Sequence, residues 1–172
     1  ITIKSNFVNP DCLTEMNVSS APNTRHCIDS KKVKPYAIFI GRLVHEKGIK
    51  TLLESWRKND IDLKVYGSGL LKSLCESINQ NNIHYLGEVN RTDAVRAVSN
   101  SHYLIMPTQW QEPFGIVVIE ALAMGIPVIA SRIGAISEII THNKNGLLFS
   151  PNNKHDLQKQ IDIMKSNKQR NK

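Results

Sequence analysis

The sequence has no long hydrophobic run and no recognisable leader. Hydrophobic residues make up 41% of its 172 residues, but no apolar stretch approaches the roughly 20 residues that a membrane-spanning helix needs. The first residues, ITIKSNFVNPD, contain no apolar signal core and no initiator methionine. The sequence therefore argues against a transmembrane helix, and we expect that truncation, rather than processing, removed a preceding segment.

Cysteines and paired histidines are also lacking. The three cysteines, Cys12, Cys27 and Cys75, are odd in number and widely spaced, which argues against a disulfide framework and a paired zinc site. None of the six histidines is paired at metal-ligand spacing. We therefore predict a cytoplasmic protein that binds no metal.

Basic residues exceed acidic ones, which gives a net charge of +7 and a pI near 9.4. Such an excess suits a phosphate-bearing ligand, the anionic inner face of the cell membrane or nucleic acid. Much of the charge lies in DSKKVKP (29–35) and MKSNKQRNK (164–172), which are typical of a solvated linker and tail. Peripheral contact with the membrane is compatible with this charge.

Composition divides the chain into three regions. Residues 1–34 are polar and irregular and are typical of an interdomain linker, with one short strand at 1–4. Residues 35–166 alternate short apolar runs with amphipathic stretches, as a folded domain does. Residues 167–172 form a basic tail.

The folded region predicts an α/β domain with a doubly wound parallel, Rossmann-like sheet, because strands alternate with helices and imply right-handed crossovers. The predicted strands are 36–40, 63–67, 83–87, 102–107, 127–131 and 146–150. The predicted helices are 48–59, 70–78, 91–99, 115–124, 137–140 and 154–164. Ligands bind such sheets beyond the carboxyl ends of the strands, so the loops to search are 41–48, 67–69, 87–90 and 107–115.

The loop GRLVHEKG (41–48) places two cations at this edge. Gly41 permits an unusual turn, and Arg42 and Lys47 can clamp a diphosphate, Arg with its planar fork and Lys as a point charge. The alternative is that both are surface charges with Glu46 as their partner. This loop alone leaves both interpretations open.

The loop PTQWQEPFG (107–115) adds a helix N-terminus. Pro113 restricts the preceding residue to an extended conformation, and Gly115 has no Cβ to obstruct a ligand. The N–H groups of Gly115, Ile116 and Val117 would then face an anion. The two loops together predict a phosphate-binding site.

Two carboxylates, Glu112 and Glu120, flank the same helix start. A carboxylate is repelled by a diphosphate, so hydrogen bonds from sugar hydroxyls suit both better. Alternatively, Glu112 is a helix-dipole charge and Glu120 a solvated residue. Trp110 and Phe114 can border a sugar or pack beneath the loop, and for Phe114 we expect core packing.

The stretches GRLVHEKG, EPFGIVVIEALAMGIPVIAS and GAISEIITHNKNGLLFSP, in this order, closely resemble the C-terminal, donor-binding half of retaining glycosyltransferases of the GT-B fold, family 4. The resemblance covers about residues 36–165. It implies that Arg42 and Lys47 hold the donor diphosphate with the N–H groups of Phe114, Gly115, Ile116 and Val117. It also implies that Glu112 contacts the transferred sugar and Glu120 the ribose.

By the same resemblance, the base lies near the loops that contain Gly67, Gly69 and Val89, and SNFVNPD (5–11) loosely matches the passage between the two domains of the family. The implied enzyme is a bacterial lipopolysaccharide, O-antigen or other surface-polysaccharide hexosyltransferase. It would move a hexose or N-acetylhexosamine from a UDP-sugar, without metal, to a lipid-linked (polyprenyl diphosphate) glycan. Because a missing N-terminal domain would bind that acceptor, this chain alone should bind donor but transfer little. The candidate catalytic residues are Glu112, Arg42 and Lys47.

Two other motifs argue against further sites, and two alternative functions stay open. Asp60 and Asp62 form a D-x-D pattern, but it precedes a strand and so belongs at the opposite edge. GSGLLK (67–72) lacks the third glycine of a dinucleotide fingerprint, which argues against NAD. The rivals are a sugar-nucleotide epimerase of the same fold and a non-catalytic basic module that binds nucleotides or nucleic acid, whose affinity would fall steeply with salt.

Overall fold

A computed structural model describes residues 34–56, 59, 61–78, 80–111 and 113–170, of which 167–170 are described by their backbone alone. The predicted strand at 1–4, Cys12 and Cys27 therefore lie outside the described residues. Within the described ranges, no helix combines the length and the apolar character needed to cross a membrane.

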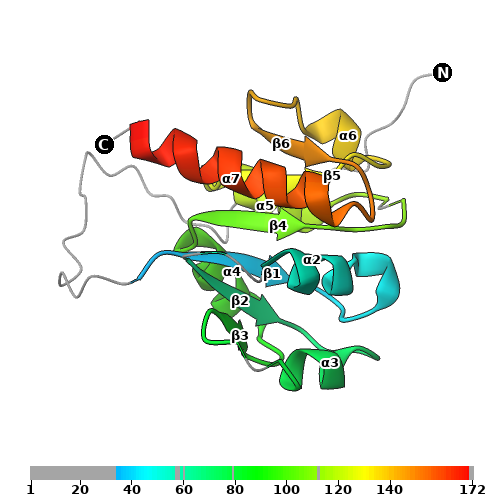
Figure 1. The fold of residues 1–172 in the computed structure, drawn as a ribbon. Coiled ribbons are helices and arrows are strands. Elements are labelled where there is room, and N and C mark those ends of the chain that lie inside the picture. Colours follow the sequence, from blue (N-terminus) through cyan, green and yellow to red (C-terminus); the bar gives the residue numbers. More distant parts are fainter. Residues whose placement is uncertain (1–33, 57–58, 60, 79, 112, 171–172) are drawn as a thin grey trace. The chain divides into compact units, whose positions relative to one another are not determined.

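Six parallel strands form one sheet in the order β3-β2-β1-β4-β5-β6 (Figure 1). They are β1 (Tyr36–Ile40), β2 (Asp62–Tyr66), β3 (Ile83–Tyr85), β4 (Tyr103–Met106), β5 (Val128–Ser131) and β6 (Gly146–Phe149). The predicted doubly wound parallel sheet is confirmed. The strand order reverses between β1 and β4, and this switch point is where such sheets bind their ligands.

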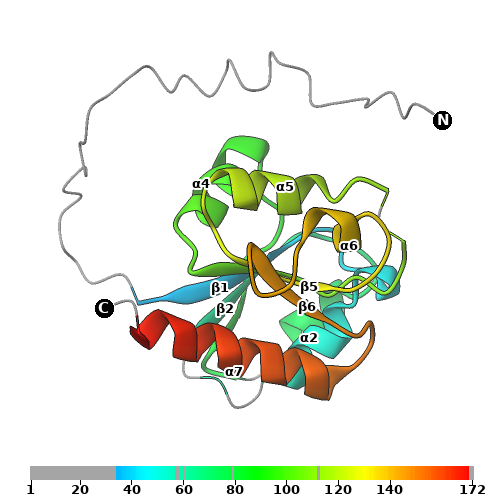
Figure 2. The same cartoon turned by 90° about the horizontal axis from the view of Figure 1, so that it is seen from above.

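Helices cover both faces of the sheet (Figure 2). They are the 3-10 turn η1 (His45–Lys47), α2 (Ile49–Ser55), α3 (Lys72–Glu76), α4 (Arg91–Ser99), α5 (Ile116–Ala123), α6 (Ile136–Ile139) and α7 (Lys154–Arg170). Helices α2 and α7 lie on one side of the strands, and α4, α5 and α6 lie on the other.

Alternate residues of β1, β4, β5 and β6 fill two separate cores. In β1, Ala37 and Phe39 pack with α2 and α7, whereas Tyr36 and Ile38 pack with α4, α5 and α6. Both faces are thus buried at the centre of the sheet, which explains why β1 and β4 are continuous apolar runs, whereas β2, near the edge, alternates between buried and half-buried residues. Between them, the two cores fix the sheet and therefore the positions of the loops at its edges.

Three helices differ from the prediction by more than one residue at an end. α2 ends at Ser55, short of 59, and α3 covers only Lys72–Glu76 of the predicted 70–78. The N–H of Leu71 instead donates to Leu43 O at 2.8 Å, so the chain before α3 is held by the first loop. α7 continues to Arg170, past the predicted end at 164, because no glycine or proline stops it.

Candidate functional site

The loops after β1 and β4 meet at the switch point. Gly48 has φ +67°, and a Cβ on it would lie 1.8 Å from the carbonyl oxygen of Pro107. The N–H of Gln109 donates to Glu46 O at 2.7 Å, and Thr108 Oγ1 donates to the same oxygen at 3.0 Å. The cationic loop and the loop that leads to α5 are therefore joined through their backbones.

The loops after β1 and β2 approach equally closely. The N–H of Leu43 donates to Ser68 O at 2.8 Å. A Cβ on Gly67 would lie 1.9 Å from Gly41 O, and one on Gly69 would lie 2.6 Å from Leu43 O. Both glycines also have positive φ, +133° and +147°. Gly67 and Gly69, expected near the base, are thus required by the close passage of two backbones.

The loop after β3 continues this row. Gly67 N–H donates to Gly87 O at 2.8 Å, and the hydroxyl of Tyr85 donates to Gly67 O at 2.9 Å. Val89 follows, half-buried, before α4 begins. Backbone contacts therefore bring together the four candidate loops, 41–48, 67–69, 87–90 and 107–115.

The two cations lie at either end of one turn. Arg42 is exposed, whereas Lys47 is half-buried at the end of η1, whose backbone closes with Lys47 N–H donating to Val44 O at 3.1 Å. Among the residues that the structure describes, no ion pair joins Glu46 to Arg42. This removes the partner that the surface-charge interpretation gave to Arg42.

Helix α5 begins at Gly115, which is left-handed with φ +57°. The N–H groups of Val118 and Ile119 both donate to Gly115 O, at 2.9 and 3.1 Å, so those of Ile116 and Val117 precede the first intrahelical bond. A Cβ on Gly115 would lie 3.5 Å from Ile136 of α6, an ordinary contact distance. The positive φ by itself accounts for a glycine here, and the room that it leaves for a ligand stays a prediction.

The residues before α5 form an exposed apolar rim. Glu112, the candidate contact to the transferred sugar, lies outside the described residues. Phe114 is 62% exposed and Trp110 is 69% exposed, so the expected core packing of Phe114 is wrong. The core beneath is filled by Val118 and Ala121 of α5, which leaves no buried position for the ring.

Glu120 lies in the second turn of α5 and forms an ion pair with Arg91, the first residue of α4. The Glu120 side chain is 27% exposed and that of Arg91 is 69% exposed. Sequence reasoning missed Arg91. The sequence does contain a signal for it. A cation in the first turn of a helix opposes the helix dipole, which indicates that Arg91 interacts with another part of the chain.

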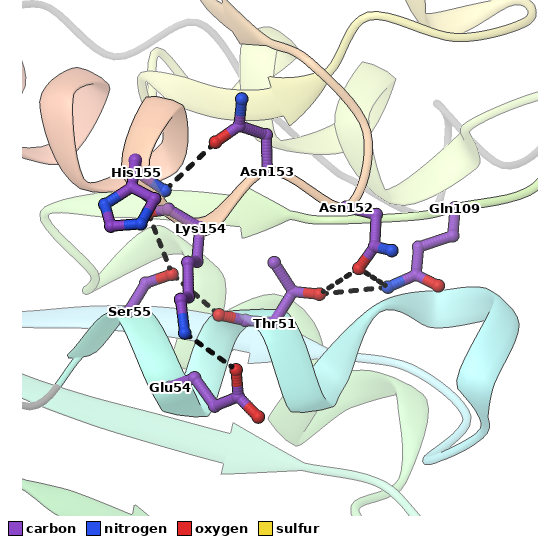
Figure 3. Close-up of polar contacts among 8 residues, drawn as sticks. All are labelled: Thr51, Glu54, Ser55, Gln109, Asn152, Asn153, Lys154 and His155. Carbon is purple, nitrogen blue, oxygen red and sulfur yellow. Dashed lines mark hydrogen bonds and ion pairs between the residues drawn. The ribbon is translucent and has the colours of Figure 1, made fainter.

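A second polar cluster lies beside the site (Figure 3). Gln109 Nε2 donates to Thr51 Oγ1 at 2.9 Å and to Asn152 Oδ1 at 3.1 Å, and Thr51 donates to Asn152 at 3.0 Å. Lys154 and Glu54 form an ion pair at 3.7 Å nearby. The cluster ties the loop after β4 to α2 and to the start of α7. Sequence reasoning missed it, because its members come from three distant segments.

The opposite, amino edge of the sheet carries its own charge cluster. Asp62 accepts a hydrogen bond from Lys34 Nζ at 2.8 Å and lies 3.5 Å from His84 Nε2. Burial raises the pKa of the Asp62 carboxyl, but Lys34 and His84 outweigh burial, so the pKa lies below its usual value. Asp62 opens β2 and therefore lies at the edge opposite the candidate site, as the sequence predicted; Asp60 is outside the described residues.

No metal site is evident in the part of the chain that is described. Within those ranges, no three His, Cys, Asp or Glu side chains are grouped so that they could hold a metal ion. Cys75 is buried, and burial together with the nearby Glu76 raises the pKa of its thiol to about 11. Such a thiol stays protonated at neutral pH, which gives it a packing role.

Comparisons with known proteins point to one family. Residues 22–172 match the family model described as Glycosyl transferases group 1. An uncharacterised glycosyltransferase of Methanocaldococcus jannaschii is 32% identical over 130 residues, which cover 73% of this chain and 37% of that protein. The D-rhamnosyltransferase WbpZ of Pseudomonas aeruginosa is 30% identical over 122 residues, which cover 67% of this chain and 32% of that protein. The chain thus spans about a third of the length of these relatives.

A solved structure shares the fold. The crystal structure of HepE from Anabaena, in complex with UDP, matches with a TM-score of 0.72 and 24% identity. The match covers 79% of this chain and 40% of that one. The six-stranded parallel sheet with helices on both faces is therefore an arrangement that known glycosyltransferase structures share.

Proposed function

The chain belongs to the glycosyl transferases group 1 family, and from this we propose that it carries the nucleotide-sugar site of a retaining, family 4 hexosyltransferase. The observation that carries the proposal is the meeting of loops 41–48 and 107–115 at the switch point between β1 and β4. Their contacts join the cation-bearing turn to the loop that leads to α5. A diphosphate is the ligand we propose for a pair of cations together with a helix N-terminus.

The diphosphate would be held from two sides. Arg42 and Lys47 supply positive charge from the first loop, and the N–H groups from Phe114 to Val117 supply hydrogen bonds from the start of α5. The backbone contacts between the two loops support the proposal that the two sets of donors act on one ligand. We propose that they neutralise the diphosphate without a metal ion.

Such an arrangement favours the departure of the nucleotide. When the bond between the anomeric carbon and the phosphate oxygen breaks, negative charge grows on the diphosphate and positive charge grows on the sugar ring. Donors aimed at the diphosphate then bind the transition state more tightly than the ground state. Glu112 would contact the transferred sugar, and a front-face route assisted by the donor phosphate would retain the anomeric configuration.

The remaining parts of the donor follow the row of loops. Glu120 would accept hydrogen bonds from the ribose, and the backbone near Gly67, Gly69 and Val89 would contact the base. The crystal structure of HepE holds UDP, which supports a UDP-sugar as the donor here.

The acceptor would be bound elsewhere. Because the chain spans about a third of its relatives' length, we propose that an N-terminal domain binds a lipid-linked, polyprenyl diphosphate glycan. The name of WbpZ, a D-rhamnosyltransferase, fits the assembly of a bacterial surface polysaccharide such as O-antigen. The enzyme would act in the cytoplasm at the inner face of the membrane, and this chain alone would bind donor and transfer little.

Nucleotide binding tests the proposal. Calorimetric titration of the chain with UDP, GDP, ADP and their sugars, with and without EDTA, should show selective binding of UDP that the chelator leaves unchanged. Lys47→Ala should raise the Kd for UDP by about tenfold or more, because one donor to the diphosphate is lost.

The matched control is Lys50→Ala, which removes the same charge from an exposed position in α2 and should change the Kd by less than about twofold. Binding of no nucleotide would refute the proposed site. An equal loss of affinity in both variants would show that only overall charge matters.

A further inference from the structure

We propose that Arg91 is a positioning residue, which holds the Glu120 carboxylate in the orientation that accepts hydrogen bonds from the nucleotide ribose. This inference rests on the proposed function, since it assigns a second residue to the ribose end of the same site.

The geometry points first to the contact itself. Arg91 Nη2 donates to Glu120 Oε1 and forms an ion pair with it. The two side chains come from different helices: Arg91 opens α4, directly after the loop expected near the base, and Glu120 lies in α5, whose N-terminus faces the expected diphosphate. The pair therefore joins the two ends of the proposed nucleotide site.

The stability of α4 does not account for a cation at this position. Helix N-termini favour negative charge, so Arg91 opposes the dipole of α4. The helix start is already capped, because Asn90 Oδ1 accepts the N–H of Asp93 at 2.9 Å. A favourable interaction of Arg91, its ion pair with Glu120, reaches across to α5.

Glu120 is the more enclosed member of the pair. Its side chain is 27% exposed, against 69% for Arg91, so the orientation of the carboxylate depends on its neighbours. A carboxylate near a diphosphate is repelled by it, and the guanidinium offsets this repulsion. With Arg91 on Oε1, the second oxygen, Oε2, can accept a ribose hydroxyl.

The experiment compares UDP with 2′,3′-dideoxy-UDP, which lacks the hydroxyls that Glu120 would accept. The unaltered chain should bind UDP about tenfold more tightly than the dideoxy nucleotide, as expected for a charge-assisted hydrogen bond. Glu120→Gln should reduce this preference to about twofold. Arg91→Ala should reduce it to a similar extent, and Arg91→Lys should restore part of it.

The matched control is Arg96→Ala, which removes another exposed arginine of α4, one paired with Asp93, and should leave the preference intact. The double variant Arg91→Ala/Glu120→Gln should lose no more preference than Glu120→Gln alone. The preference is a ratio of two affinities measured on one sample, so partial unfolding of a variant affects both affinities and cancels.

The outcomes separate the two proposals. If UDP binds and Glu120→Gln removes the ribose preference, but Arg91→Ala leaves it unchanged, the role of Arg91 is overturned and the proposed site stands. If Arg91→Ala weakens both nucleotides equally, its contribution is general charge and not positioning. If the unaltered chain binds no nucleotide, both the site and the role of Arg91 fail.

Discussion

The two edges of the sheet are built by different means. At the carboxyl edge, the loops after β1, β2, β3 and β4 are joined by backbone hydrogen bonds and by glycines at which a Cβ would strike a carbonyl oxygen, Gly48, Gly67 and Gly69. At the amino edge, the starts of β1, β2 and β3 are joined by polar side chains, Lys34, Asp62 and His84. The loops at the carboxyl edge are thus held together largely through their backbones, whereas at the amino edge the contacts of Lys34 and His84 with Asp62 are made by side chains.

Exposed apolar side chains are also distributed unequally between the two edges. Within the described residues, the large hydrophobic side chains that remain exposed all lie in loops at the carboxyl edge or in the first turn of α5: Leu70, Leu86, Trp110, Phe114, Ile116 and Ile119. Exposed apolar surface gathered in one place is typical of a binding surface. The exposed apolar side chains therefore support the proposal that the carboxyl edge is the binding edge.

The largest expected effect tests the backbone contacts. Gly67→Ala should lower the free energy of unfolding by about 3 kcal/mol or more, because the added Cβ would lie 1.9 Å from Gly41 O and φ is +133°. Urea denaturation measures the change. The control is Gly87→Ala, at φ +75° with no atom within 4 Å of the added Cβ, which should lose only about 1 kcal/mol. Equal losses would mean that backbone strain, and not the close approach of two loops, fixes the glycine.

Local signals predicted the fold well. The strand at 36–40 and the helix at 91–99 were predicted to the residue, because their apolar spacing is a property of the local sequence. The boundaries of α3 and the exposure of Phe114 were not predictable in this way. The start of α3 depends on the contact of Leu71 with Leu43, which is far away in the sequence, and the exposure of Phe114 depends on how the loop before α5 passes over the core.

The site was predicted only in part, for a related reason. Strand ends mark the loops that meet at one edge, so the meeting of 41–48 with 107–115 followed from the predicted topology. The pairing of Glu120 with Arg91 did not, because α4 and α5 are neighbours only once the sheet order is known. The roles of Glu112 and of the cations remain predictions.

A smaller effect sharpens the comparison within the carboxyl edge. Gln109→Ala removes the side-chain bonds to Thr51 and Asn152 and should destabilise the chain by about 1 to 2 kcal/mol. The affinity for UDP should change by less than about twofold, since the backbone bond from Gln109 to Glu46 remains. Gln111→Ala, at an exposed neighbouring position, is the control for the stability change. A large loss of affinity would show that side chains, and not the backbone, hold this loop.

The smallest effect is expected at the amino edge and depends on pH. The pKa of Asp62 is lower in the folded chain than its ordinary value of 3.8, so its ionised form stabilises the fold above that value, and this contribution is lost as the pH falls through the folded pKa. Asp62→Asn should therefore be less stable than the unaltered chain by up to about 1 kcal/mol at pH 7, and the difference should shrink at pH 3. Urea denaturation at the two pH values measures it. The affinity of this variant for UDP at pH 7 should stay the same, because the other edge carries the proposed site. A loss of affinity would mean that the two edges are energetically coupled and that their division of roles is wrong.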